Sequence, residues 1–185
     1  MIFDPDQYWR DHGPHLAPPG SSSPEQALVE KELGLLLEEL QTINGQVQSV
    51  LDVGCGQGRL ADFLERELPQ AKYSGMDLGE AQIKGTRMVR PDGDFFLARL
   101  QDFTPDRQWD LVLASEVLLH IPPADIEVAC RNLLNVTGKY LVTVDWTQPV
   151  DGPIAEWNWL HDYDELLQPD VEIVVGLQSI FLKRM

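Results

Sequence analysis

Hydrophobic and polar residues follow a helical period in the first part of the chain. Between Pro24 and Asn44 apolar residues recur at helical spacing, Ser23 suits an N-cap, and Pro24 suits the first helical position. We predict an amphipathic helix there, with a buried face made of Leu28, Leu33, Leu36, Leu37 and Leu40. Residues 4–24 are rich in Pro, Gly and Ser, which predicts an irregular arm before this helix.

Short apolar runs then alternate with stretches of helical spacing. The runs that are rich in β-branched and aromatic residues predict strands at residues 47–53, 71–76, 94–98, 109–114, 139–145, 171–175 and 178–183. Helices are expected at residues 58–68, 79–90 and 122–135, and a short one at residues 156–168. Repeated strand and helix units of this kind predict an α/β fold with a doubly wound parallel sheet.

The end of the chain modifies this sheet. The last two predicted strands are separated only by Gly176 and Leu177, a tight connection, so the last strand is expected to be antiparallel. The predicted sheet is therefore seven-stranded and mostly parallel, with helices on both faces. A length of 185 residues suits one domain. We expect an N-terminal arm or lid over residues 1–23 and a single domain over residues 24–185.

A glycine-rich loop follows the first predicted strand. Residues 52–58 read DVGCGQG, and a helix is predicted directly after them. Glycines here permit a tight turn and let a ligand lie against the backbone, with the N-terminus of the next helix facing it. Taken alone, such a loop is also compatible with any sharp connection between a strand and a helix.

Asp77 at the end of the second strand sharpens the prediction, because a carboxylate there can reach the ribose hydroxyls of a nucleoside. The glycine spacing, Gly-x-Gly-x-Gly preceded by Asp52, differs from the Gly-x-Gly-x-x-Gly of dinucleotide enzymes. Residues 50–60, VLDVGCGQGRL, resemble motif I of the class I S-adenosylmethionine-dependent methyltransferases, in particular the small-molecule branch. The resemblance spans residues 47–183 and implies a Rossmann-like fold, methyl transfer and S-adenosyl-L-methionine as cofactor.

The resemblance also implies roles for residues at the strand ends. Gly54 and Gly56 are expected under the methionine part of the cofactor, and Asp52 near its ammonium group, directly or through water. Asp77 is expected at the ribose. Asp102 corresponds to a carboxylate near the adenine amino group, although a cap or turn role is the alternative. The full expected set is Asp52, Gly54, Cys55, Gly56, Asp77, Leu78, Asp102, Phe103, Ser115 and Glu116.

The fourth strand and the loop after it, residues 109–121, resemble the fourth motif of small-molecule methyltransferases. Ser115, Glu116 and Val117 are therefore expected to face the cofactor. The sequence lacks both the Asn/Asp-Pro-Pro-aromatic motif of amino-methylating nucleic-acid enzymes and the Pro-Cys motif of cytosine-5 enzymes. Methylation of DNA bases is therefore disfavoured.

Methyl transfer needs an aligned nucleophile and, for a hydroxyl acceptor, a base. The candidate catalytic residues are His161, which lies in a tryptophan-rich segment, and Glu116. An equal alternative for His161 is a position on the solvent-facing side of an amphipathic helix, with no catalytic role. The arm either folds over the site as a lid or is a disordered leader, and His120 either touches a ligand or only packs. The candidate acceptor-binding residues are Tyr8, Trp9, His120, Trp146, Trp157 and His161.

Composition and charge limit the kinds of molecule that the protein is expected to bind. Hydrophobic residues make up 43% and charged residues 24%, as in globular proteins. The net charge of −16 and the lack of basic clusters disfavour nucleic acid and membrane surfaces. Cys55 and Cys130 lie in unrelated contexts, so no disulfide and no metal site is expected. With no secretory signal and no apolar run long enough to span a bilayer, a cytoplasmic location is expected.

Several functions stay open at this point. The leading hypothesis is an enzyme that methylates an O or N atom of a small molecule. A protein side chain or an RNA end is the alternative acceptor, and a non-catalytic S-adenosylmethionine-binding protein is a third reading. A nicotinamide-dependent enzyme is weaker, because the third glycine comes one residue early.

Overall fold

A seven-stranded sheet forms the centre of the computed structural model, which describes residues 4–12, 34, 40–146, 158–175 and 178–185. The first five strands pair in parallel, and β7 lies between β5 and β6, antiparallel to both. The predicted fold class is therefore confirmed. The strand order is β3-β2-β1-β4-β5-β7-β6, with β1 (Ser49–Val53), β2 (Lys72–Asp77), β3 (Asp94–Leu97), β4 (Trp109–Ser115), β5 (Thr137–Trp146), β6 (Val171–Val175) and β7 (Gln178–Arg184).

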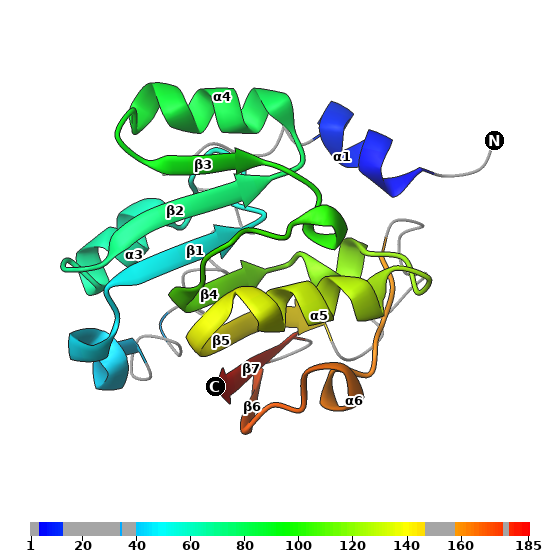
Figure 1. Ribbon diagram of the computed structural model, residues 1–185. Coiled ribbons are helices and arrows are strands. Elements are labelled where there is room, and N and C mark those ends of the chain that lie inside the picture. The colour runs from blue at the N-terminus through cyan, green and yellow to red at the C-terminus, as the bar shows by residue number, and fades with distance from the viewer. Residues whose placement is uncertain (1–3, 13–33, 35–39, 147–157, 176–177) are drawn as a thin grey trace.

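Helices cover both faces of this sheet (Figure 1). On one face α3 (Ala61–Glu67) and α4 (Glu80–Val89) share an apolar cluster with Val50 of β1. On the other face α5 (Ile126–Val136) and α6 (Tyr163–Leu167) share a second cluster with Leu51 and Val53. Because side chains alternate between the faces of a strand, β1 has to be apolar on both sides. Asp52 is the buried polar residue of that strand.

The parallel strands bring their carboxyl ends to one edge of the sheet. The chain leaves β1 and β4 toward opposite faces, and in open α/β sheets ligands bind in the crevice at such a reversal of strand order. Two short 3₁₀ helices, η3 (Leu100–Asp102) and η4 (Leu118–His120), follow β3 and β4 at this edge. The helix α1 (Pro5–His12) lies beyond the same edge (Figure 1).

The prediction of an irregular arm is wrong for residues 5–12, which form α1. The Asp4 side chain accepts a hydrogen bond from the Gln7 amide at 3.1 Å, and Pro5 occupies the first turn. An Asp followed by Pro is a helix start of the same kind as the Ser23 and Pro24 pair. The high Pro and Gly content of the following residues hid this signal.

Other helix boundaries also moved. The helix predicted from residue 58 begins at Ala61, because Gly58 has a left-handed φ of +85°. The helix predicted from residue 122 begins at Ile126, after a turn in which the Asp125 amide donates to the Pro122 carbonyl. The helix predicted at residues 156–168 shortens to α6, which Asp162 caps by accepting from the Glu165 amide. The helix predicted from residue 24 lies mostly outside the described residues, although residues 40–43 are helical.

Candidate functional site

The glycine loop after β1 is held against the end of β2. The amides of Gly54 and Cys55 both donate to the Met76 carbonyl, at 2.8 and 3.0 Å. Gly54, Gly56 and Gly58 have φ angles of +70°, +54° and +85°, a region that glycine adopts far more readily than other residues. The loop therefore adopts this shape because the three residues with positive φ angles are glycines, which have no Cβ.

The two sides of this loop differ in how much space they leave. A Cβ on Gly54 would lie 2.5 Å from Cγ2 of Val117, so the loop after β4 packs directly on that glycine. A Cβ on Gly56 would meet no heavy atom within 4 Å. Gly54 thus serves packing between two loops, and Gly56 leaves open space above the backbone.

Asp77 connects the glycine loop to the start of α4. Its two carboxylate oxygens accept hydrogen bonds from the Gly56 amide at 2.9 Å and the Gly79 amide at 2.8 Å. Burial raises the pKa of Asp77, and these amide donors act in the opposite direction. Each oxygen retains a lone pair for a further donor, such as a ligand hydroxyl. Leu78 follows directly in the chain.

Asp52 lies in the core beneath the loop. Its side chain is 2% exposed, and its Oδ2 accepts a hydrogen bond from the Tyr73 hydroxyl at 2.7 Å. Burial raises the pKa of Asp52 to about 7, while the Tyr73 hydroxyl and the Arg59 charge act in the opposite direction. Its expected contact with a cofactor ammonium group stays a prediction.

Cys55 points away from the open side of the loop. It is buried, and a Cβ on Gly75 of β2 would lie 2.7 Å from its sulfur. Gly75 therefore makes the room that this thiol occupies. Burial raises the pKa of Cys55 far above the ordinary thiol range.

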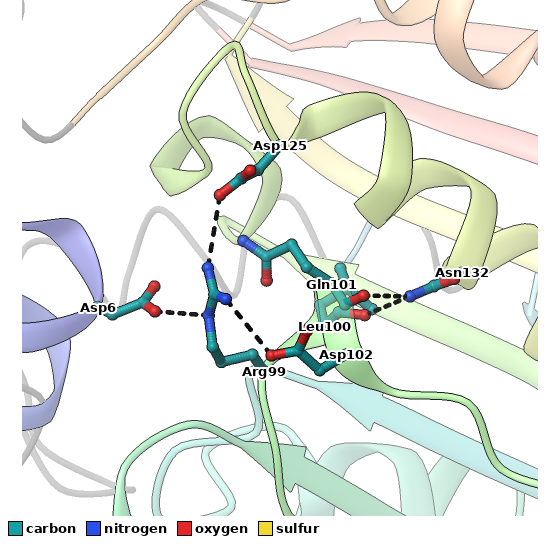
Figure 2. Close-up of polar contacts among 7 residues, drawn as sticks. All are labelled: Asp6, Arg99, Leu100, Gln101, Asp102, Asp125 and Asn132. Atoms are coloured by element: carbon teal, nitrogen blue, oxygen red, sulfur yellow. Dashed lines mark hydrogen bonds and ion pairs between the residues drawn. The ribbon is translucent and has the colours of Figure 1, made fainter.

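Asp102 lies on η3, at the surface of the carboxyl edge. Its side chain is 68% exposed, and one oxygen lies 3.4 Å from a nitrogen of Arg99. The Asn132 amide of α5 fixes η3 by donating to the Leu100 and Gln101 carbonyls at 2.9 and 2.8 Å (Figure 2). Phe103 is buried against Phe96 and Trp109, so its side chain belongs to the core.

Arg99 joins this segment to the N-terminal helix. Figure 2 shows its guanidinium among the carboxylates of Asp6, Asp102 and Asp125, at 2.5, 3.4 and 3.4 Å. Asp6 belongs to α1, and burial raises its pKa. The ion pair therefore holds α1 at the carboxyl edge.

The loop after β4 receives contacts from several elements. Ser115 ends the strand, and Glu116 then adopts a left-handed φ of +55°, which is uncommon outside glycine and often marks functional sites. The Trp9 ring of α1 lies 4.2 Å from the His120 ring, and Tyr8 packs edge-on against Trp9. The structure thus brings Trp9 and His120 together, as a lid over this edge would require.

His161 approaches the same loop from the segment before α6. Its Nε2 lies 3.0 Å from the Ile121 carbonyl oxygen, to which it donates, and burial lowers its pKa. Trp146 ends β5 with a half-buried side chain. Its buried indole N–H has no hydrogen-bond partner in the described part of the chain. Trp157 lies outside the described residues.

Two negative findings apply to the described residues alone. They contain no group of three His, Cys, Asp or Glu side chains that could hold a metal ion. None of the helices assigned within them is long and apolar enough to cross a membrane.

Comparison with known proteins agrees with this geometry. A family model described as a methyltransferase domain matches residues 50–139, which include the glycine loop, Asp77 and the loop after β4. Over these residues the chain is similar to methyltransferase domains. Trans-aconitate 2-methyltransferase of Shigella dysenteriae is 29% identical over 122 residues, which cover 64% of this chain and 48% of that protein. The chain thus spans about half the length of the curated relatives it matches.

Solved structures show the same methyltransferase fold. Magnesium protoporphyrin IX methyltransferase from Synechocystis, crystallised with bound S-adenosylmethionine, superposes with a TM-score of 0.70 at 16% identity, covering 100% of this chain and 98% of that one. The PH0226 protein from Pyrococcus horikoshii gives a TM-score of 0.72 at 15% identity, covering 99% of both chains. At these identities the likeness concerns the fold alone.

Four residues of this candidate site were not singled out from the sequence. Asn132 is a polar residue on the buried face of a helix, and Asp145 closes an apolar strand as Asp77 does, so both carried a readable signal. Tyr73 looks like any aromatic strand residue. Arg99 had no local signal, because its partners come from distant parts of the chain.

Gly54 and Gly56 should respond differently to substitution by alanine. Gly54→Ala adds both backbone strain and a clash with Val117, and it should lower the free energy of unfolding by about 2 to 4 kcal/mol. Gly56→Ala adds strain alone and should cost about 1 to 2 kcal/mol. Urea denaturation of the two variants measures the difference. Val117→Ala should restore part of the loss in the Gly54 variant and none in the Gly56 variant, and equal losses would contradict this account.

Proposed function

We propose that the protein transfers a methyl group from S-adenosylmethionine to an O or N atom of a small-molecule acceptor. The observation that carries the proposal is the position of Asp77, whose carboxylate is held by the Gly56 and Gly79 amides beside the open side of the glycine loop. A carboxylate fixed there suits a pair of ribose hydroxyls. The match of residues 50–139 to a methyltransferase-domain model supports the same function.

The residues at the carboxyl edge fit this cofactor. Gly56 leaves room for the methionine part, Asp77 offers acceptors to the ribose, and the exposed Asp102 offers an acceptor to the adenine amino group. Asp52, buried and bonded to Tyr73, would act on the ammonium group through the loop or through water. Gly54, Cys55, Leu78 and Phe103 would contribute backbone, while Ser115 and Glu116 would face the methyl group.

The bound cofactor supplies an electrophilic methyl group on a positively charged sulfur. The protein's own contribution is to align the acceptor atom and to exclude water. The loop after β4, Trp9 of α1 and the segment around His161 surround the place where the acceptor would lie. Tyr8, His120, Trp146 and Trp157 are the further residues proposed to bind the acceptor.

A small acceptor is favoured by several observations. The curated relatives carry names of small-molecule methyltransferases, which makes trans-aconitate a sensible first trial acceptor. The net charge of −16 is unfavourable for an RNA end, whereas a basic protein remains the alternative acceptor. A protein that binds the cofactor without turnover is the remaining alternative.

Cofactor binding is the first test. Asp77→Ala removes the proposed ribose acceptor and two loop contacts, so the Kd for S-adenosylhomocysteine should rise by about 10- to 100-fold. Isothermal titration calorimetry measures this. Asp92→Ala, which changes an exposed acid before β3, is the matched control and should leave the Kd unchanged.

The same titration distinguishes the alternatives. NAD should not bind, and the parent protein should bind both sulfur nucleosides; no binding of either would overturn the proposal. Labelled S-adenosylmethionine incubated with cell extract, followed by separation by size, reports the acceptor class. Label in a small molecule other than S-adenosylmethionine itself is expected. Label only in protein or RNA would establish the alternative acceptor, and binding without any label would indicate a non-catalytic protein.

His161 is the proposed base, with Glu116 as the second candidate. Because burial lowers the pKa of His161 from its ordinary value, its imidazole is mainly neutral at pH 7 and is free to accept a proton there. The transfer rate should therefore be flat above pH 7 and fall in acid. His161→Gln retains a donor for the Ile121 carbonyl, yet it should lower the rate by about 10²- to 10⁴-fold and remove the acid limb.

The rate of label transfer against pH measures this effect. Calorimetry should give an unchanged Kd for S-adenosylhomocysteine in the same variant. A His161→Gln protein that keeps the parent rate and pH profile would exclude the base role, and the same experiment on Glu116→Gln would then examine the second candidate.

The N-terminal arm is proposed to act as a lid, with residues 24–185 as the domain beneath it. The Asp6 and Arg99 ion pair and the Trp9 and His120 contact support this role. A partly buried ion pair and one ring contact together contribute about 1 to 2 kcal/mol. The double variant Asp6→Ala, Trp9→Ala should therefore weaken S-adenosylhomocysteine about 5- to 30-fold.

Deleting residues 1–20 should have the same effect on the Kd, measured by calorimetry. Gln7→Ala, on the exposed face of α1, is the control that should leave affinity unchanged. Unchanged affinity and turnover in the deletion would rule out the lid.

A further inference from the structure

We propose that Asp145 is a positioning residue, whose carboxyl group holds the loop of residues 116–121 in the place where it meets the cofactor. The inference rests on the proposed function, because it assigns a purpose to the exact placement of that loop. Asp145 lies near the end of β5, on the face covered by α5 and α6. It touches neither the glycine loop nor Asp77 in any recorded hydrogen bond of the described residues.

The carboxyl group of Asp145 is completely buried, with 0% exposure. Its Oδ1 accepts a hydrogen bond from the Leu119 amide at 3.2 Å. The Leu118 amide also interacts with the carboxyl group and acts to lower its pKa. Its Oδ2 is buried and has no hydrogen-bond partner in the described part of the chain. Burying a carboxyl group with one unsatisfied oxygen costs free energy of folding. We therefore attribute its presence to a structural need for a hydrogen-bond acceptor at this position.

The ionisable groups that act on Asp145 give no reason to keep it charged. Glu116 faces it from the loop, Cys130 from α5 and Tyr163 from α6, and none of these is a cation. Burial, reinforced by Glu116, raises its pKa well above the ordinary value. A neutral carboxylic acid keeps one carbonyl oxygen as an acceptor for the Leu119 amide.

The loop that Asp145 holds is the meeting point of the candidate site. The Leu119 peptide is fixed on both sides, because its amide donates to Asp145 and its carbonyl accepts from the Trp159 amide at 2.7 Å. Val117, two residues earlier, packs on Gly54, and His120, one residue later, contacts Trp9. A shift of this peptide would therefore move the glycine loop contact and the lid contact together.

The backbone of the same loop needs support from outside. Glu116 has a left-handed φ of +55°, and its amide donates to the Val144 carbonyl at 2.8 Å. A strained residue persists where surrounding contacts determine the conformation. Asp145 is the residue next to Val144 on β5, so adjacent residues of one strand hold both the strained start of the loop and its centre.

Two substitutions separate positioning from simple packing. Asp145→Asn keeps an oxygen acceptor and adds no charge, so the Kd for S-adenosylhomocysteine should stay within about 3-fold of the parent at pH 6 to 8. Asp145→Ala removes the acceptor and should raise that Kd at least 10-fold. Thr143→Val is the matched control, because Thr143 is buried on the same strand face and its hydroxyl also lacks a partner among the described residues.

Calorimetry gives the Kd, and hydrogen exchange at residues 116–121 reports the loop directly. Faster exchange in Asp145→Ala, with parent exchange in Asp145→Asn and Thr143→Val, is expected. The proposal is overturned if Asp145→Ala keeps the parent affinity and exchange, or if Asp145→Asn loses as much affinity as Asp145→Ala. If the alanine variant does not fold, the asparagine variant decides alone. Failure of the parent to bind S-adenosylhomocysteine would instead reject the proposed function, and the exchange data would still report the anchoring.

Discussion

Parallel pairing of β1 with β2 on one side and β4 on the other is the constraint on which the candidate site depends. This pairing brings the glycine loop, Asp77 and the loop after β4 to one edge of the sheet. Their side chains do not need to contact one another for this to happen. The contacts then refine that placement. The Met76 carbonyl takes two amides of the glycine loop, and Val117 packs on Gly54 from the opposite side.

Carboxyl groups fill much of this edge, although the protein is already strongly acidic. Asp52, Asp77 and Asp145 each lie at or near the end of a strand, and burial raises the pKa of each. Their partners are a tyrosine hydroxyl or backbone amides, which are neutral donors. The edge therefore fixes its loops with hydrogen bonds, while the ion pairs of Arg99 lie nearer the surface.

The sequence predicted what depends on local pattern. Apolar runs predicted all seven strands, and the Gly-x-Gly-x-Gly spacing and Asp77 predicted the proposed cofactor site, because each signal is local and stands at the end of a predicted strand. It failed where a partner is remote. Arg99 forms ion pairs with Asp6 and Asp125, which lie far from it in the sequence. The last predicted helix is shortened to α6, and the Trp159 amide before it donates to the carbonyl of Leu119, forty residues earlier. The helix at residues 5–12 was missed for another reason, since a proline-rich neighbourhood outweighed the Asp4 cap.

Gly75 has an effect that goes beyond the shape of the sheet. By leaving space on β2 it lets the sulfur of Cys55 turn inward, away from the open side of the glycine loop. A thiol is a better nucleophile than most acceptors, and a thiolate beside a sulfonium would compete for the methyl group. Burial also raises the pKa of Cys55 and so keeps the thiol protonated, which disfavours alkylation and oxidation of its sulfur. Gly75 on β2 thus gives Cys55 of the glycine loop a buried place beside the proposed site of a reactive cofactor.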